Sequence, residues 1–376
     1  MNFYANQTTI KSFKDSKLIF GPFTLLVGTN ASGKSNILDA LRFLQGIARG
    51  YPLTEIISEK RGEGGELQWS GIRGGTKELI YQQQARFSLD ISTQLKRQSV
   101  DYDIEIEIEP KKTPKLLKKI VTVADKIVFE ANSSTPQSVP RVMSQAFEKG
   151  HSSVPISELF HFYRAMRFLD LNPTAMRLRS LTNHTTLGDQ GENLASVLKA
   201  LCADSAKKQT LIEWIQALTP MDATDFEFYT HPYTDEVLLL LVEGNGKKTS
   251  IYSASDGTLR FLAMLTALFT PEPPPFYFIE EIENGIHPTR LHLLIELLEK
   301  KAAAGIQIVA TTHSPQLLSL INAKSLKHAA LIYRLEEKPD SRIKRILDIP
   351  DAQRVIEEQN ISLLHASGWF EDMMEC

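Results

Sequence analysis

Gly28-Thr29-Asn30-Ala31-Ser32-Gly33-Lys34-Ser35 matches G-x-x-x-x-G-K-[ST], the pattern of a phosphate-binding loop. Small residues at this spacing let successive backbone N–H groups turn inward around a phosphate, Lys34 supplies a positive charge, and the Ser35 hydroxyl can ligate Mg²⁺. The flanks fit as well, because residues 23–27 predict a short buried strand and residues 36–44 have helical spacing. Phosphates would then lie at a helix N-terminus, where free N–H groups favour negative charge. A chance glycine-rich turn is the alternative interpretation.

The composition is that of an ordinary globular protein. At 376 residues the chain exceeds one average domain, so we expect a large α/β unit with an inserted lobe. The formal net charge of −3 gives no general signature of nucleic-acid binding, so any DNA contact needs a local basic patch. Cys202 and Cys376 are too few for a disulfide framework, and no apolar run reaches the ~20 residues of a membrane span. We therefore expect a cytoplasmic protein without a membrane partner.

The chain divides by composition into five predicted parts. Glycine-rich residues 49–75 within the first part predict a flexible loop, with a second phosphate cradle as the alternative. From residue 276 onward, buried strands alternate with helices, which indicates a parallel sheet. The parts are a core segment with the phosphate loop (1–84), an antiparallel β-lobe (85–130), a linker (131–155), a helical lobe with strands (156–250) and a second core segment (251–376).

The β-lobe carries a cluster of lysines. Residues 103–109 alternate between isoleucine and acidic residues, which predicts a strand with one apolar and one acidic face. A returning strand is expected over residues 120–129, so that the lysines form the basic tip of a hairpin. They form either a solvated face or a contact for nucleic-acid phosphates. They are Lys111, Lys112, Lys115, Lys118 and Lys119.

Three later motifs make the phosphate loop more specific. An apolar strand over residues 276–279 ends in Glu280 and Glu281, the Walker B arrangement, in which the first carboxylate helps to hold Mg²⁺ and the second polarises the attacking water. A second buried strand ends near His313, at the edge where open α/β sheets bind ligands. Ser255 and Gly257 precede an apolar helix, which indicates either an anion site or an ordinary helix cap.

The order of these motifs resembles that of the ATP-binding-cassette (ABC) type of ATPase. Within that class it is similar to the SMC/RecF/OLD branch, and most of all to OLD-like AAA-family ATPases. The resemblance covers residues 8–335. The segments that carry it are Gly28–Asn36, Ser255–Arg260, Glu280–Pro288 and Thr312–Pro315, with Gly191–Leu194 as a further element.

The resemblance implies a P-loop NTPase fold of the ABC type, α/β with a mixed or parallel sheet core and inserted β- and helical lobes. Two copies would enclose two ATP molecules with Mg²⁺. Glu281 would be the general base, His313 the switch, Lys34 a catalytic cation, and Ser35 and Glu280 metal ligands. Residues 283–287 would form the D-loop that crosses the dimer interface. One copy would bind ATP through Gly28, Asn30, Ser32, Gly33, Lys34, Ser35 and Asn36, and the other through Ser255 and Gly257.

Some positions depart from the family pattern or remain open. Ile282 stands where proline is common, which alters loop stiffness rather than chemistry. The Q-loop residue is poorly defined, with Asn172 as one candidate and Gln82–Gln84 as the other. OLD nucleases continue into a Toprim nuclease domain, and no comparable Asp/Glu cluster precedes Cys376, so we expect that domain to be absent.

By the same resemblance, ATP-driven dimer closure would control a DNA-directed process in a bacterial anti-phage system, through a separate effector such as a nuclease or toxin. The first alternative is a RecF-like repair ATPase that binds DNA directly, through residues 111–119, Arg342, Lys344 and Arg345. A transporter subunit conflicts with the Ser-Asp-Gly signature and the long insertion. A nucleotide-locked scaffold with slow hydrolysis is a further alternative.

Overall fold

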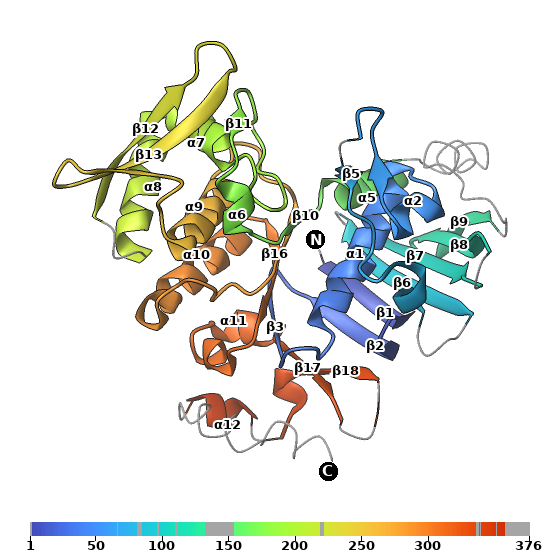
Figure 1. Cartoon of the computed structure of the whole chain (residues 1–376). Helices are drawn as coiled ribbons and strands as arrows, with labels where there is room; N and C mark the ends of the chain where they lie inside the picture. The colour runs from blue at the N-terminus through green and yellow to red at the C-terminus, as the bar shows by residue number, and fades with distance from the viewer. Residues whose placement is uncertain are drawn as a thin grey trace. The chain divides into compact units, whose positions relative to one another are not determined.

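The computed structural model describes residues 2–65, 67–80, 85–95, 98–109, 112–131, 154–218, 222–335, 338, 340–350 and 352–357. The chain forms two compact units (Figure 1). Unit 1 comprises residues 1–166 and 322–376, and unit 2 comprises residues 167–321. Lys111, Gln82–Gln84, Cys376 and most of the predicted linker 131–155 lie outside the described residues.

Unit 1 is built on a mixed sheet whose strand order is β3-β17-β18-β2-β1-β6-β7-β8-β9. The pairs β3–β17 and β18–β2 are parallel, whereas the other neighbours pair antiparallel. The strands are β1 (Asn2–Ile10), β2 (Phe13–Phe20), β3 (Phe23–Val27), β6 (Arg86–Leu95), β7 (Gln98–Glu107), β8 (Lys115–Val123), β9 (Lys126–Ala131), β17 (Ala330–Arg334) and β18 (Ser341–Arg345), and β4 (Lys60–Arg61) pairs separately with β5 (Leu67–Trp69).

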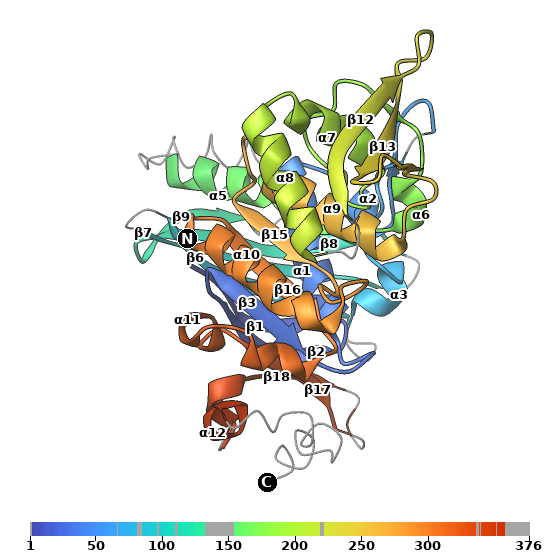
Figure 2. The ribbon, with the colours of Figure 1, turned by 90° about the vertical axis from the view of Figure 1, so that its left-hand side faces the viewer.

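Helix α1 (Lys34–Arg49) covers one face of this sheet, as Figure 1 shows. Its apolar side chains Ile37, Leu41 and Leu44 line a small apolar cavity together with side chains of β1, β2 and β6. Helix α5 packs beside α1 and also contacts β6 and β7 (Figure 2). Strand β3 is buried at every residue, so it can hold the phosphate loop firmly at its end. The remaining elements of unit 1 are α2 (Leu53–Ile57), α3 (Gly75–Leu79), α5 (Val154–Ala165), α11 (Ala323–Leu326), η4 (Ile346–Asp348) and α12 (Ala352–Glu357).

Unit 2 contains a parallel sheet in the order β10-β15-β16 and a separate antiparallel sheet in which β13 pairs with β11, β12 and β14. Helix α7 contacts the antiparallel sheet, and α8 and α9 pack against one another. The strands are β10 (Arg167–Leu169), β11 (Ser180–Leu181), β12 (Ala223–Thr230), β13 (Glu236–Glu243), β14 (Lys248–Ser250), β15 (Phe276–Ile279) and β16 (Gln307–Thr312). The helices are α6 (Pro173–Met176), α7 (Leu194–Cys202), α8 (Ser205–Leu218), α9 (Asp256–Leu268), η2 (Pro288–Arg290), α10 (Leu291–Ala303) and η3 (Pro315–Ser319).

Three predictions for the sheets and loops were wrong in detail. Residues 120–129 are not one strand, since β8 ends at Val123 and β9 starts at Lys126, across a turn in which Ala124 and Asp125 both have positive φ. Residues 49–75 hold α2, β4 and β5 rather than a continuous loop. The last part of the chain is not uniformly parallel, because β18 runs antiparallel to β17. No helix among the described residues is long and apolar enough to cross a membrane.

Candidate nucleotide site

The phosphate loop of unit 1 lies between the end of β3 and the start of α1, as its spacing predicts. Gly33 caps α1 with φ 114°, and Ala31 also has a positive φ of 61°, so the loop turns sharply into the helix. A Cβ at Gly28 would lie 2.3 Å from the carbonyl oxygen of Ile332, so a side chain does not fit there. The tip at Asn30 is exposed.

Lys34 and Ser32 have the surroundings of a phosphate site. The ammonium of Lys34 donates to the carbonyl oxygens of Gly28 and Thr29 at 2.6 and 2.8 Å, which places a nearly buried charge against the loop. The Ser32 hydroxyl is buried and makes no hydrogen bond within the described part of the chain. Buried polar groups are nearly always hydrogen-bonded, so an acceptor or donor from a ligand such as ATP fits this hydroxyl.

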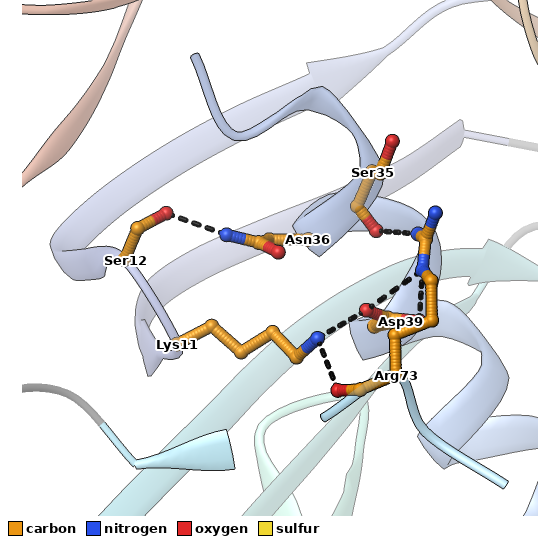
Figure 3. A network of polar contacts seen from close by, with 6 residues as sticks. All are labelled: Lys11, Ser12, Ser35, Asn36, Asp39 and Arg73. Atoms are coloured by element: carbon orange, nitrogen blue, oxygen red, sulfur yellow. Dashed lines mark hydrogen bonds and ion pairs between the residues drawn. The ribbon is translucent and has the colours of Figure 1, made fainter. Parts of the chain in front are cut away.

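A second layer of polar contacts fixes the loop to α1, and Figure 3 shows it. Asp39, one helical turn after Ser35, is 1% exposed and accepts a hydrogen bond from Lys11 at 2.5 Å. The guanidinium of Arg73 contacts the same carboxylate at 3.2 Å and donates to the carbonyl oxygen of Ser35. Lys11 also donates to the carbonyl of Arg73 at 2.7 Å. Arg73, which is remote in sequence, therefore holds the backbone of the predicted metal ligand Ser35, and Asp39 and Lys11 in turn hold Arg73.

Hydroxyl groups complete this layer. The side chain of Asn36 donates to Ser12 Oγ at 2.6 Å, so this amide is engaged by the protein itself (Figure 3). Ser341 Oγ donates to Ser12 Oγ at 2.6 Å and would lie 2.5 Å from a Cβ placed on Gly33. Arg334 in turn donates to Ser341 at 3.0 Å. Residues from both chain segments that form unit 1 therefore support the phosphate loop.

The Walker B strand of unit 2 is β15, whose four residues are all buried. Glu280 follows it, and its N–H donates to the carbonyl of Leu169 on the parallel neighbour β10 at 3.1 Å. Glu281 has a positive φ of 50°, uncommon for a residue other than glycine. Its N–H donates to Thr311 Oγ1 at 3.0 Å. The two acids therefore leave the strand in different backbone conformations.

Glu281 and His313 meet at the ends of β15 and β16. The ring nitrogen Nε2 of His313 lies 3.0 Å from Oε1 of Glu281. The backbone N–H of His313 donates to the carboxylate of Glu283 at 2.7 Å. The side-chain amide of Asn284 donates to Oε2 of Glu281. Burial raises the pKa of Glu281, but the hydrogen bonds from His313 and Asn284 and nearby positive charge together lower it more, so the net pKa lies below the usual value. Glu281 is thus kept ionised and can accept a proton.

The signature residues begin α9. Ser255 is the N-cap, and its hydroxyl accepts from the N–H of Thr258 at 3.2 Å, so the ordinary capping role is present. Its exposure leaves it accessible to a ligand as well. Gly257 lies against Gly285 so closely that a Cβ on it would be 2.2 Å from the Gly285 carbonyl oxygen. Arg177 holds the turn through Asp256 and the carbonyl of Ala254, each at 2.7 Å.

Other predicted elements have structural roles or remain predictions. Asn172 caps α6 and accepts from Thr174 at 2.9 Å, which leaves its Q-loop role a prediction, and Gln82–Gln84 lie outside the described residues. In the Gly191–Leu194 element, Asn193 closes a turn by accepting from Gly188 at 2.8 Å and donating to Thr186 at 2.9 Å. That element positions α7.

The prediction that Lys119 lies in the basic tip of a hairpin was wrong. This lysine is 2% exposed, on β8 rather than in the turn, and its ammonium lies 5.5–6.0 Å from the ring centres of Phe160, Tyr102 and Phe129. Burial lowers the pKa of Lys119 to about 8. It cannot contact a phosphate from this position. Lys115 and Lys118 are exposed on the same strand.

Sequence reasoning missed Lys11, Ser12, Asp39, Arg73 and Asn284. The only signal in the sequence was for Asp39, which lies four residues after Ser35 and therefore on the same helix face. The others act on the loop or on Glu281 from turns, where periodicity gives no information. Asn284 lies in a segment that sequence analysis assigned to the D-loop without a role for this side chain.

Comparison with known proteins agrees with this geometry. A sequence model for the family described as "AAA domain, putative AbiEii toxin, Type IV TA system" matches residues 23–319. An ATP/GTP phosphatase of Helicobacter pylori is 22% identical over 357 residues, which are 89% of this chain and 92% of that protein. The chromosome partition protein Smc of Mycolicibacterium paratuberculosis is 35% identical over 81 residues, 21% of this chain and 7% of that protein.

A solved structure, an SmcHead bound to the C-winged helix domain of ScpA, shares the fold with a TM-score of 0.54 at 14% identity, covering 91% of this chain and 96% of that one. The predicted fold class, an α/β P-loop ATPase of the ABC type with a mixed sheet, is thereby confirmed. The five-part division of the chain and the roles of the individual site residues remain predictions. The chain belongs to the AAA-domain family matched over residues 23–319 and is an ATPase that shares the fold of an SMC head.

Proposed function

We propose that two copies of this chain close around two ATP molecules and that this closure controls a DNA-directed process through a separate effector protein. The observation that carries the proposal is the pairing of Glu281 with His313 at the end of a buried parallel strand. A carboxylate held by a histidine at a strand end is suited to take a proton from water. The exposed signature serine Ser255 would face the nucleotide of the other copy.

In this proposal the water oxygen attacks the γ-phosphorus of ATP, its proton passes to Glu281, and the bond to the bridging oxygen breaks to leave ADP. His313 holds the carboxylate, and Lys34 turns from the loop carbonyls to the phosphates. Mg²⁺, held by Ser35 and Glu280, would neutralise the charge that develops on the phosphate oxygens. The residues that would bind ATP are Gly28, Asn30, Ser32, Gly33, Lys34, Ser35, Asn36 and, from the second copy, Ser255 and Gly257.

Two observations support a separate effector. The related SMC head was solved with a partner protein, the C-winged helix domain of ScpA, bound to it. The family description names the matched domain a putative toxin of a Type IV TA system, and a toxin–antitoxin system is a two-component arrangement. We infer that this chain supplies the ATP-dependent switch, and its partner the nuclease or toxin of an anti-phage system. Plating of phage on cells with the wild-type gene and its neighbours, against the same genes with Lys34→Ala, tests this part.

The RecF-like alternative, direct DNA binding, has weaker support. Lys119 is buried, and two of the other candidates form ion pairs, Arg342 with Asp340 at 3.1 Å and Arg345 with Asp348 at 2.8 Å. A cation that is already paired gains less from a phosphate than a free one. The remaining candidates are too few for a strong patch among the described residues.

The test is ATP hydrolysis by the purified protein with and without linear duplex DNA, together with sedimentation in ATP. We expect slow hydrolysis that is indifferent to DNA and a dimer that requires ATP. Glu281→Gln should lower kcat by about 100-fold or more, because a general base contributes rate factors of this size, and should retain the ATP-bound dimer. The exposed Glu296 on α10 supplies the matched control Glu296→Gln, which should behave as wild type. Strong stimulation by DNA would favour the RecF-like alternative, and normal turnover by Glu281→Gln would remove Glu281 from its role.

A further inference from the structure

Residues 281–284 form a tight turn directly after the Walker B strand, and it is closed twice between the same two residues. The backbone N–H of Asn284 donates to the carbonyl of Glu281 at 3.0 Å, and its side-chain amide donates to Oε2 of Glu281. His313 contacts the other carboxylate oxygen at 3.0 Å. Because each oxygen has a partner on a different element, the carboxylate plane of Glu281 is fixed in rotation.

The backbone of this turn is also unusual. Glu281 lies in the left-handed region with φ 50°, a conformation that persists only where the surroundings enforce it. Thr311 Oγ1 accepts the N–H of Glu281 at 3.0 Å, and the N–H of Ile282 donates to the Thr311 carbonyl at 3.2 Å. These contacts anchor one end of the turn to β16. Asn284 is at the other end, next to Gly285.

The signature turn supports that second end. Gly285, next to Asn284, has φ 81°, and a Cβ placed on it would lie 2.5 Å from Cα of Gly257. A Cβ on Gly257 would be 2.2 Å from the Gly285 carbonyl oxygen. The two backbones are therefore in direct contact, with no side chain between them to absorb a displacement. A shift of either turn must move the other.

We propose that Asn284 is a positioning residue, which holds the Glu281 carboxylate in the orientation that accepts the proton of water, and that the Gly257–Gly285 contact makes the signature turn the support for that orientation. The proposal rests on the proposed function of Glu281 as the base. It adds a route between two sites, because a ligand at Ser255 and Gly257 then acts on Glu281 of the same chain.

The variant Asn284→Asp tests whether the side chain of Asn284 positions the Glu281 carboxylate or only stabilises the turn of residues 281–284. Asparagine and aspartate both favour turns, so the backbone of residues 281–284 is retained. The substitution removes the amide donor and sets a second carboxylate against Glu281, which raises the pKa of the pair. We expect kcat to fall about tenfold or more while KM for ATP changes less than about twofold. The acidic limb of the pH profile of kcat should move up by about one pH unit or more.

Two further variants guard against a trivial loss of folding. Asn284→Ser keeps a donor and should recover most of the rate with a pH profile close to wild type. Asn245→Asp is the matched control in the turn before β14, where Asn245 Oδ1 accepts from the N–H of Lys247 at 2.8 Å and aspartate retains the acceptor. It should leave kcat and the pH profile unchanged. Thermal unfolding of each variant verifies that it is folded.

Gly285→Ala tests the signature support, because its Cβ forces the two turns apart. We expect a loss of kcat and an upward shift of the acidic limb that is smaller than in Asn284→Asp, because the amide donor is displaced but no second carboxylate is added. A wild-type pH profile of kcat in Asn284→Asp overturns the role of Asn284. Equal losses of kcat in Asn284→Asp and Asn284→Ser, without a shift of the acidic limb, overturn it as well. A wild-type pH profile in Gly285→Ala overturns the supporting role of the signature turn. If Glu281→Gln is inactive while Asn284→Asp is normal, the proposed function stands and the positioning role falls. Normal turnover by Glu281→Gln removes both.

Discussion

Buried charged side chains have opposite surroundings in two regions of unit 1, the phosphate-loop end and the β-lobe (β6 to β9). Beside the phosphate loop, Lys11 and Arg73 both pair with the buried carboxylate of Asp39. In the β-lobe, Lys119 is surrounded by aromatic rings and forms no ion pair with another described residue. Asp90 and Asp103 even lie directly opposite one another on neighbouring strands.

This comparison shows where charged side chains hold other groups in defined positions. Buried ion pairs add little net stability compared with apolar packing, but they hold groups in defined positions. Paired charges therefore occur where Ser35 and the phosphate loop must be oriented. In the β-lobe the charges lower stability without such an effect on the loop, so substitutions in the two regions should have opposite signs.

The largest expected effect is that of Asp39→Asn, which breaks the paired region. It leaves Lys11, whose side chain is 6% exposed, as an uncompensated buried charge. We expect the free energy of unfolding to fall by about 3 kcal/mol and Tm to fall by several degrees. Calorimetry measures this change. The double variant Lys11→Met with Asp39→Leu should regain most of the loss, and its failure to do so would mean that the charges themselves stabilise unit 1.

Lys119→Met should stabilise the protein. Burial lowers the pKa of Lys119 from 10.5 to about 8, and such a difference corresponds to about 3 kcal/mol as an upper bound. Below pH 8 both the folded and the unfolded wild type are protonated there, so the cost is fully present. Between pH 8 and 10.5 the unfolded state binds more protons, so wild-type stability rises with pH relative to the variant. Urea unfolding at pH 7 and pH 10 checks this.

The exposed neighbour Lys118 supplies the matched control for that experiment. Lys118→Met should change the free energy of unfolding by less than about 0.5 kcal/mol, as is usual for surface positions. Equal effects of the two variants would show that burial of Lys119 is not the cause.

The smallest effect is expected for Asp90→Asn. Burial, followed by the charge of Asp103, raises the pKa of Asp90 to about 6. A carboxyl whose pKa is higher in the folded state stabilises the fold at low pH, and this stabilisation is lost as pH rises through 6. The variant should therefore gain about half a kcal/mol or less at pH 7, after allowance for solvent screening, and no advantage at pH 4. Thermal unfolding at both pH values is the measurement, and a gain at pH 4 would contradict this cause.

Local patterns predicted the elements that hold the site. The strand before the phosphate loop, the helix after it and the apolar strand before Glu280 all follow from runs and periodicities within a few residues. The ends of such elements fix where Lys34 lies in unit 1 and where Glu281 and His313 lie in unit 2, so the position of each residue within its own unit could be predicted from spacing.

Contacts between distant residues could not be predicted in the same way. Ser12 and Ser341 are 329 positions apart, and nothing in either segment marks their contact. Lys119 follows Lys118 in an apparently solvated run, but a bulge between Glu105 and Ile106 in the pairing of β7 with β8 turns Lys119 to the buried face. A shift of one residue reverses the face of every following side chain, and composition cannot detect it.

The strand that carries the phosphate loop has another consequence, for the growing polypeptide. β3 pairs with β17, about 300 residues later in the chain, and Ser341 closes against Ser12 beside Gly33. At about 5–20 residues per second, a ribosome needs at least roughly fifteen seconds to reach those partners after it has made the loop. Throughout that interval β3 lacks its partner β17 and Gly33 lacks its neighbour Ser341, so the phosphate loop reaches its final form only when synthesis is nearly complete.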